Sequence, residues 1–140
     1  MKSKTKTIAY WTTTLPIAME TLAGGMADLA RGRAMILSGP PVAGIVTHLG
    51  YPVYLLTILG FWKVLGGIVL LAPRLPRLKE WAYAGIVFEL TGAAASYVLH
   101  GDNARELASP LVFAAFAVAS WALRPPERIL GTLLPERAVA

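Results

Sequence analysis

Four long apolar stretches, separated by short polar segments, run along the chain. The clearest covers residues 52–72, a run of 21 residues whose only charged side chain is Lys63. About 20 predominantly apolar helical residues are enough to cross a hydrocarbon core of roughly 30 Å. The other three stretches cover residues 7–28, 81–99 and 108–123. The pattern therefore predicts four transmembrane helices.

These helices predict an all-α fold, an integral membrane four-helix bundle formed by residues 1–126. The first apolar stretch is expected to be an uncleaved helix rather than a signal peptide, because three more spans follow it. A shorter apolar piece at 42–49 has too few residues to span. It is expected to form an interfacial or re-entrant turn of helix. Residues 127–140 contain prolines and arginines and are expected to be a loosely ordered cytoplasmic tail.

The charge distribution supports lipid as the solvent and predicts an orientation. Charged residues make up 15% of the chain, against about 25% in a typical soluble domain. The net charge of +5 comes from short connections rather than a dense basic face, so we expect no nucleic-acid partner. With the N-terminus inside, nine of the 13 lysines and arginines fall on the inner side and three on the outer. This bias predicts a multi-pass protein of the cytoplasmic membrane with both termini cytoplasmic.

Three ionisable residues fall near the centres of their predicted spans, namely Glu20, Lys63 and Glu89. Their backbone depths should agree within about 5 Å, which long side chains can bridge. An unpaired charge at this depth costs several kcal/mol. We therefore expect a buried charge cluster in which Lys63 pairs with Glu89, with Glu20 or with both.

Two roles for this cluster remain open. Low dielectric penalises a net charge, so one carboxyl group is expected to share a movable proton, as a proton relay or a quinone-reducing site requires. Alternatively, the cluster is a salt bridge that only fixes how the helices assemble.

A candidate ligand pocket follows from small and aromatic residues that share helix faces or lie near the predicted outer end. Its members are Trp62, Gly85, Gly92, Ser96, His48 and His100. Asp28, His48, His100 and Asp102 offer imidazole and carboxylate groups that zinc can bind, but without a tight spacing motif. We expect ordinary interfacial residues there and no metal site, with the rim of a ligand pocket as the alternative.

Catalytic motifs do not identify a reaction. The sequence contains no GxGxxG, phosphate-loop or HExxH pattern. It has no cysteine, which excludes disulfides, thiol redox chemistry and cysteine-ligated metal centres. No catalytic residue is assigned.

Several stretches resemble the DoxX-like family of small four-span bacterial membrane proteins. They are LAGGMADLARG at 22–32, HLGYPVYLLTILGFWKVLGGIVLLAP at 48–73, RLKEWAYAGIVFELTGAAASYV at 77–98 and LRP at 123–125. The resemblance implies a four-helix bundle. Relatives in the wider group take part in thiosulfate:quinone oxidation or in membrane-bound oxidoreductase assemblies. The family supplies no agreed catalytic residues.

Three functional hypotheses follow. The first is a membrane protein that binds a hydrophobic ligand such as a quinone, or that serves as the membrane subunit of an oxidoreductase complex with a redox-protein partner. The second is a small proton-coupled transporter, against which the internal cation Lys63 argues. The third is a non-catalytic structural or assembly protein. A homo-oligomer is compatible with all three.

Overall fold

A computed structural model describes residues 3–30 and 41–126. This part of the chain contains no strand. It forms the helices α1 (Ser3–Leu29), α2 (Val42–His48), α3 (Tyr54–Leu71), α4 (Pro76–His100) and α5 (Ala104–Ala122). The predicted all-α class is confirmed. Residues 1–2, residues 31–40 and the tail expected at 127–140 lie outside the described residues.

Helix boundaries follow from local chemistry at the turns. Pro73 has no backbone N–H and ends α3, and Pro76 occupies the first turn of α4, where that missing donor is not needed. Gly101 ends α4 with a positive φ of 87°, a conformation that glycine adopts without strain. The helix α4 therefore begins five residues before the stretch predicted from 81, and residues 76–80 are helical rather than part of a basic turn.

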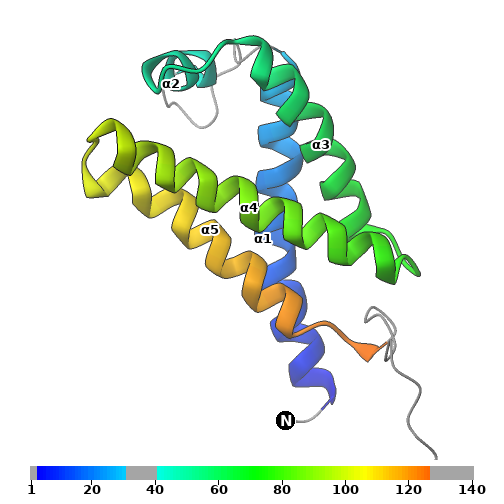
Figure 1. Cartoon of the computed structure of the whole chain (residues 1–140). Helices are drawn as coiled ribbons and strands as arrows, with labels where there is room; N and C mark the ends of the chain where they lie inside the picture. Colours follow the sequence, from blue (N-terminus) through cyan, green and yellow to red (C-terminus); the bar gives the residue numbers. More distant parts are fainter. Residues whose placement is uncertain (1–2, 31–40, 127–140) are drawn as a thin grey trace, which may run out of the picture.

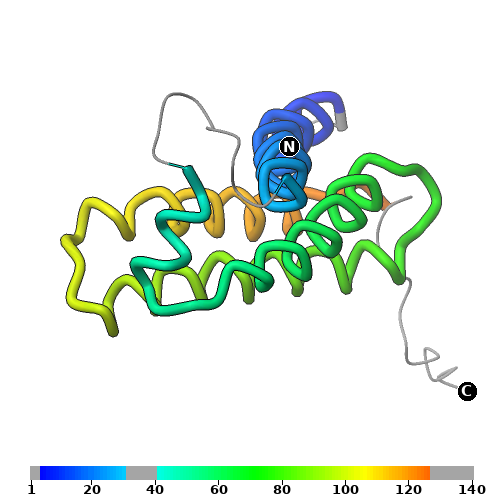
Figure 2. The backbone as a smooth tube through the Cα atoms, turned by 90° about the horizontal axis from the view of Figure 1, so that it is seen from above, coloured from blue at the N-terminus to red at the C-terminus, as the bar shows by residue number. Residues whose placement is uncertain are grey.

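The four long helices pack in a ring, in which each helix packs against two others. α1 packs against α3 and α5, and α4 packs against α3 and α5. α4 and α5 lie side by side as an antiparallel hairpin, and this hairpin crosses α1 obliquely (Figures 1 and 2). The short helix α2 lies beside the end of the α4–α5 hairpin (Figure 1).

The apolar core lies where the four long helices meet. It consists of Ile17, Ala18, Leu70, Tyr83, Ile86, Leu90, Ala114 and Ala117. Hydroxyl groups tie three helices together within it. Tyr83 Oη lies 2.7 Å and Thr14 Oγ1 2.6 Å from Ser120 Oγ. The core thus combines apolar packing with a hydrogen-bonded link between α1, α4 and α5.

The outer surface is unusually apolar for a protein in water. Large hydrophobic side chains are exposed on every long helix, including Leu15 and Met19 on α1, Phe61 and Trp62 on α3, Phe88 on α4 and Val112 on α5. Within the described residues, the two helices α3 and α4 are long and apolar enough to cross a membrane. At 1.5 Å per residue, α3 is about 27 Å long. Surfaces of this kind indicate contact with lipid or with protein.

Candidate functional site: a charge cluster between three helices

The charge cluster lies beside a close contact between α1 and α3. A Cβ atom added to Gly60 would lie 2.8 Å from Gly25 O and 2.8 Å from the backbone nitrogen of Leu29. A Cβ atom added to Gly25 would lie 2.7 Å from Lys63 Cβ. Only glycine fits at these two positions, and their absent side chains let the helix backbones approach each other. Lys63 is thereby held directly against α1.

The Lys63 ammonium group lies between two carboxylates from different helices. Its Nζ is 2.8 Å from Oε1 of Glu89 on α4 and 2.9 Å from Oδ2 of Asp28 on α1. The Asp28 side chain is 2% exposed, and the Lys63 side chain is 15% exposed. The structure thus brings together Lys63 and Glu89, two of the three residues expected in the cluster, and adds Asp28.

Glu20 borders the cluster without forming an ion pair in the described part of the chain. A Cβ atom on Gly24 would lie 3.4 Å from Glu20 Oε1 and 3.6 Å from Lys63 Nζ, so both groups face the same small space. Thr21 Oγ1 donates a long hydrogen bond of 3.5 Å to Glu20 Oε2. Glu20 is therefore a neighbour of the ammonium group, and Asp28 is its direct partner on α1.

Sequence reasoning misplaced Asp28 by grouping it with the histidines of the outer end. A signal was present, because Glu20, Gly24 and Asp28 recur every four residues and share one helix face. What the spacing does not determine is which acid of that face lies opposite Lys63. This depends on the axial offset between α1 and α3, which the contacts of Gly25 and Gly60 set.

The cluster has an unbalanced charge. Three carboxyl groups, those of Glu20, Asp28 and Glu89, face one ammonium group. Asp28 Oδ1 is buried and has no hydrogen-bond partner among the described residues. Burying a net charge in an apolar medium is costly. The arrangement can lower this cost by taking up protons or a cation.

The expected ligand pocket does not form as one cavity. Trp62 is 65% exposed. Gly85 and Gly92 are exposed, and a Cβ atom on either would have no neighbour within 4 Å. The expected place of the two glycines in a ligand pocket is therefore wrong, because α4 packs on α3 and α5 through its other sides.

The remaining members of the expected pocket lie near the end of the molecule that carries α2. Ser96 Oγ is 2.9 Å from Tyr51 Oη and donates to the carbonyl of Gly92. His48 and His100 lie with their ring centroids 4.3 Å apart. His48 Nε2 is 2.9 Å from Asp102 Oδ1. These residues form a separate group from the Lys63 cluster.

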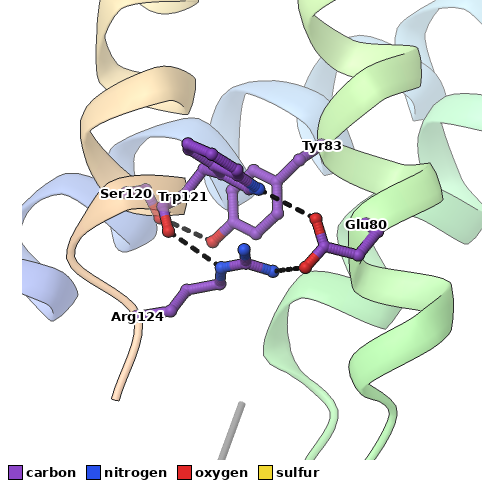
Figure 3. Close-up of polar contacts among 5 residues, drawn as sticks. All are labelled: Glu80, Tyr83, Ser120, Trp121 and Arg124. Carbon is purple, nitrogen blue, oxygen red and sulfur yellow. Dashed lines mark hydrogen bonds and ion pairs between the residues drawn. The ribbon is translucent and has the colours of Figure 1, made fainter. Parts of the chain in front are cut away.

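A second polar network, which the sequence did not predict, closes the opposite end of the α4–α5 hairpin (Figure 3). Arg124 Nη1 is 2.6 Å from Glu80 Oε1, and Trp121 Nε1 donates to Glu80 Oε2 at 2.9 Å. The Arg124 guanidinium also lies 5.3 Å from the ring centroids of Tyr83 and Trp121. It is buried although it follows the last helix, where sequence reasoning treated it as one of several loop charges.

Lys79 is the other charged residue that sequence reasoning missed. Its Nζ donates to the carbonyls of Val69 and Leu70 at 2.5 and 2.7 Å, and the residue is fully buried. Pro73 lacks the N–H that would otherwise bond to Val69 O, so this carbonyl needs another donor. The proline after the helix was the available signal.

Comparison with known proteins identifies a family. The sequence profile of the DoxX-like family matches residues 12–120. The chain belongs to the DoxX-like family. The match covers α1 from Thr12 onward and nearly all of α5, and so includes every member of the charge cluster. Family membership and the two apolar helices together indicate a membrane protein. No curated protein and no solved structure matches the chain.

Proposed function

We propose that this DoxX-like protein crosses the bilayer four times and holds an exchangeable proton in the Lys63 cluster. The observation that carries the proposal is the placement of Lys63 Nζ between Asp28 and Glu89, with Glu20 beside them. One cation cannot neutralise three carboxylates, and lipid offers no water to solvate the remaining negative charge. Retaining a proton within the cluster lowers its net charge.

Packing supports four spans rather than the two that length and composition alone select. α1 and α5 contact each other, and each also contacts one of the two apolar helices. Both expose large apolar side chains, such as Met19 on α1 and Leu111 on α5. If α3 and α4 lie in lipid, the two helices packed against them lie there as well. The lysine and arginine bias then favours cytoplasmic termini.

A proton held in the membrane core is what a membrane subunit of a redox assembly needs, because electron transfer to a quinone is accompanied by proton uptake. The cluster offers three acceptors and one donor from three helices, and the titration belongs to the group as a whole. A purely structural salt bridge would require only one acid for Lys63. The excess of carboxyl groups distinguishes a proton-binding centre from a simple helix link.

Infrared spectroscopy tests the proposal directly. The full chain, reconstituted at neutral pH in ether lipids that have no carbonyl group, should show the C=O stretch of a protonated carboxyl group that shifts in D2O. Glu20→Gln should weaken this band. Glu80→Gln is the matched control and should leave it unchanged, because Glu80 already pairs with Arg124 at 2.6 Å.

Two outcomes would contradict a proton-binding centre. One is a wild-type spectrum without the protonated-carboxyl band. The other is a band that persists at full strength in Glu20→Gln, Asp28→Asn and Glu89→Gln alike, which would place the proton outside the cluster.

An apolar groove on the α4–α5 hairpin favours a second function, binding of a hydrophobic ligand with a polar head group such as a quinone. The groove has a volume of about 310 Å³ and is lined by Glu80, Tyr83, Ala84, Val87, Phe88, Val118 and Trp121. Glu80 and Trp121 belong to the polar network at one end, and the rest of the lining is mainly apolar. Few polar groups in a mainly apolar pocket are typical of ligand sites.

Mass spectrometry of lipid extracts from the purified protein tests this second function. A quinone should be enriched with the wild type and lost with Ala84→Trp, which fills the groove. Ala95→Trp is the control, because Ala95 is exposed on the same helix outside the groove. Equal recovery of quinone from both variants, or no quinone from the wild type, would contradict quinone binding in this groove.

A further inference from the structure

A second group of chemically active side chains lies at the end of the molecule that carries α2, away from the Lys63 cluster. It consists of His48, the last residue of α2, His100, the last residue of α4, and Asp102 in the following turn. One nitrogen from each histidine and one carboxylate oxygen of Asp102 all lie within 4.8 Å of one another. His48 and Asp102 are 54 residues apart in the sequence, so the fold rather than a local motif brings them together.

The turn after α4 is built to place Asp102 beside the histidines. Gly101 takes a left-handed conformation, and its N–H donates to the carbonyls of Tyr97 and Val98. The N–H of Asp102 also donates to Tyr97 O, at 3.0 Å. This closed turn reverses the chain and directs the Asp102 carboxylate toward His48 Nε2, 2.9 Å away.

One oxygen of the Asp102 carboxylate is free to bind a cation or to accept a hydrogen bond. Its Oδ1 accepts from His48 when that nitrogen is protonated, whereas Oδ2 is buried and has no hydrogen-bond partner within the described ranges. A buried carboxylate oxygen without a partner loses its hydration without compensation. A cation beside it would provide that compensation.

We propose that His48, His100 and Asp102 bind a divalent transition-metal ion, with zinc as the reference case. Two imidazole nitrogens and one carboxylate oxygen form a donor set found in catalytic zinc sites and in non-haem iron sites. Magnesium and calcium prefer all-oxygen sites. This inference does not depend on the proton-binding proposal, because it uses none of the same residues.

The geometry needs only a small adjustment to hold the ion. Ligand atoms of a tetrahedral zinc ion lie about 3.3 Å apart, given bond lengths near 2.0–2.1 Å. The present separations range from 2.9 Å to within 4.8 Å. Both histidines are exposed, so rotation of the His100 ring can close the site without disturbing the core.

Three protein ligands leave a coordination position open, and the structure provides space beside it. A cavity of about 330 Å³ borders the site and is lined by Gly44, Ile45, His48, Tyr97, Asp102, Asn103 and Glu106. An open position facing a cavity is typical of metal sites that bind a water molecule or a substrate, whereas structural zinc sites are closed by four protein ligands.

Metal titration of the full chain in detergent tests the site. The protein should carry a histidine-free purification tag and be treated with a chelator, and Zn²⁺ binding is then measured by calorimetry and Co²⁺ binding by visible absorption. The chain has only two histidines and no cysteine, so imidazole ligation of Co²⁺ can arise only from His48 and His100. We expect one ion per chain.

Three variants separate a metal site from a simple ion pair. His100→Ala leaves the His48–Asp102 contact intact, yet should weaken Zn²⁺ binding more than about tenfold, as should Asp102→Asn. Glu106→Gln is the matched control, because Glu106 lines the same cavity outside the proposed ligand set. Circular dichroism checks that each variant stays helical.

The absence of saturable Zn²⁺ binding to the wild type would overturn the proposal. Unchanged affinity in a His48→Ala/His100→Ala double variant would do so too, and would leave the His48–Asp102 contact as an ion pair that only docks α2. Equal losses in Glu106→Gln and Asp102→Asn would show diffuse attraction to surface acids and would also reject the site.

Discussion

At the scale of single residues, the packing of three helices depends on the ion pairs of one ammonium group. Lys63 reaches Asp28 and Glu89 at the same time, so it links α3 to both α1 and α4. Removing one partner of a buried ion pair leaves an uncompensated charge, which in soluble proteins costs about 3–5 kcal/mol. The cluster is therefore expected to govern stability as well as proton binding.

Lys63→Met should lower the free energy of unfolding by about 3 kcal/mol, because it leaves two buried carboxylates without their cation. Adding Glu89→Gln should recover part of this loss, since one of the stranded carboxylates is then neutral. Unfolding by sodium dodecyl sulfate in mixed micelles measures both effects. Lys4→Met, at an exposed position, is the control. Equal stability of the single and double variants would argue against direct pairing with Glu89.

Glu20→Gln should behave differently from Asp28→Asn. Glu20 has no ion pair in the described part of the chain, whereas Asp28 lies 2.9 Å from the ammonium group. Glutamine at position 20 is neutral, like a glutamate that holds the cluster's retained proton, so the free energy of unfolding should change little. Asp28→Asn removes an ion pair and should lower it. The same unfolding assay compares the two, and a larger loss in Glu20→Gln would reverse their assigned roles.

Sequence reasoning identified the ionisable residues of the core but not all of their partners. Lys63 and Glu89 are expected to pair because they lie at about the same depth in their predicted spans. The choice between Glu20 and Asp28 depends on the axial offset of α1 against α3, which sequence spacing alone does not determine. The partners of Lys79 and Arg124 depend likewise on how helix ends meet in three dimensions.

At the scale of helices, glycine positions decide which faces pack. Gly60 and Gly67 on α3 meet α1 at distances that exclude any side chain, whereas Gly85 and Gly92 on α4 face open space. In sequence these glycines look alike, because all lie within apolar helices near a charged residue. The sequence therefore predicted the all-α class but not which small residues lie inside.

Gly60→Ala and Gly92→Ala should have opposite effects. At Gly60 the new methyl group would lie 2.8 Å from backbone atoms of α1, and overpacking of this kind costs about 1–3 kcal/mol. At Gly92 it would meet nothing within 4 Å, and alanine favours a helix over glycine by about 1 kcal/mol. Comparing the two in the unfolding assay checks the α1–α3 contact. Similar losses in both would mean that Gly92 is packed.

At the scale of the whole described structure, a charge cluster lies buried between three helices, and large apolar side chains lie exposed on every long helix. This distribution is the reverse of a soluble domain and matches a protein whose solvent is lipid. The turn between α3 and α4 and the turn between α4 and α5 lie at opposite ends of α4. They should therefore face opposite sides of the membrane.

Single cysteines test this orientation cleanly, because the chain contains none of its own. With both termini cytoplasmic, a membrane-impermeant maleimide added to intact cells should label Ala104→Cys and not Arg74→Cys. Both positions are exposed, and both variants should react after the cells are opened. The reverse pattern would invert the orientation, and labelling of both in intact cells would argue against a span by α4.

The ion pair itself is measured most directly by solid-state NMR of the full chain in lipid bilayers. With ¹⁵N-labelled lysine and ¹³C-labelled aspartate, only Asp28 and Asp102 contribute aspartate carboxyl signals. We expect a short-range dipolar contact between a lysine ammonium nitrogen and the Asp28 carboxyl carbon. Lys63→Met should abolish it and Lys6→Met should preserve it. A lipid-embedded protein that lacks this contact, or keeps it in Lys63→Met, would contradict the proposed cluster.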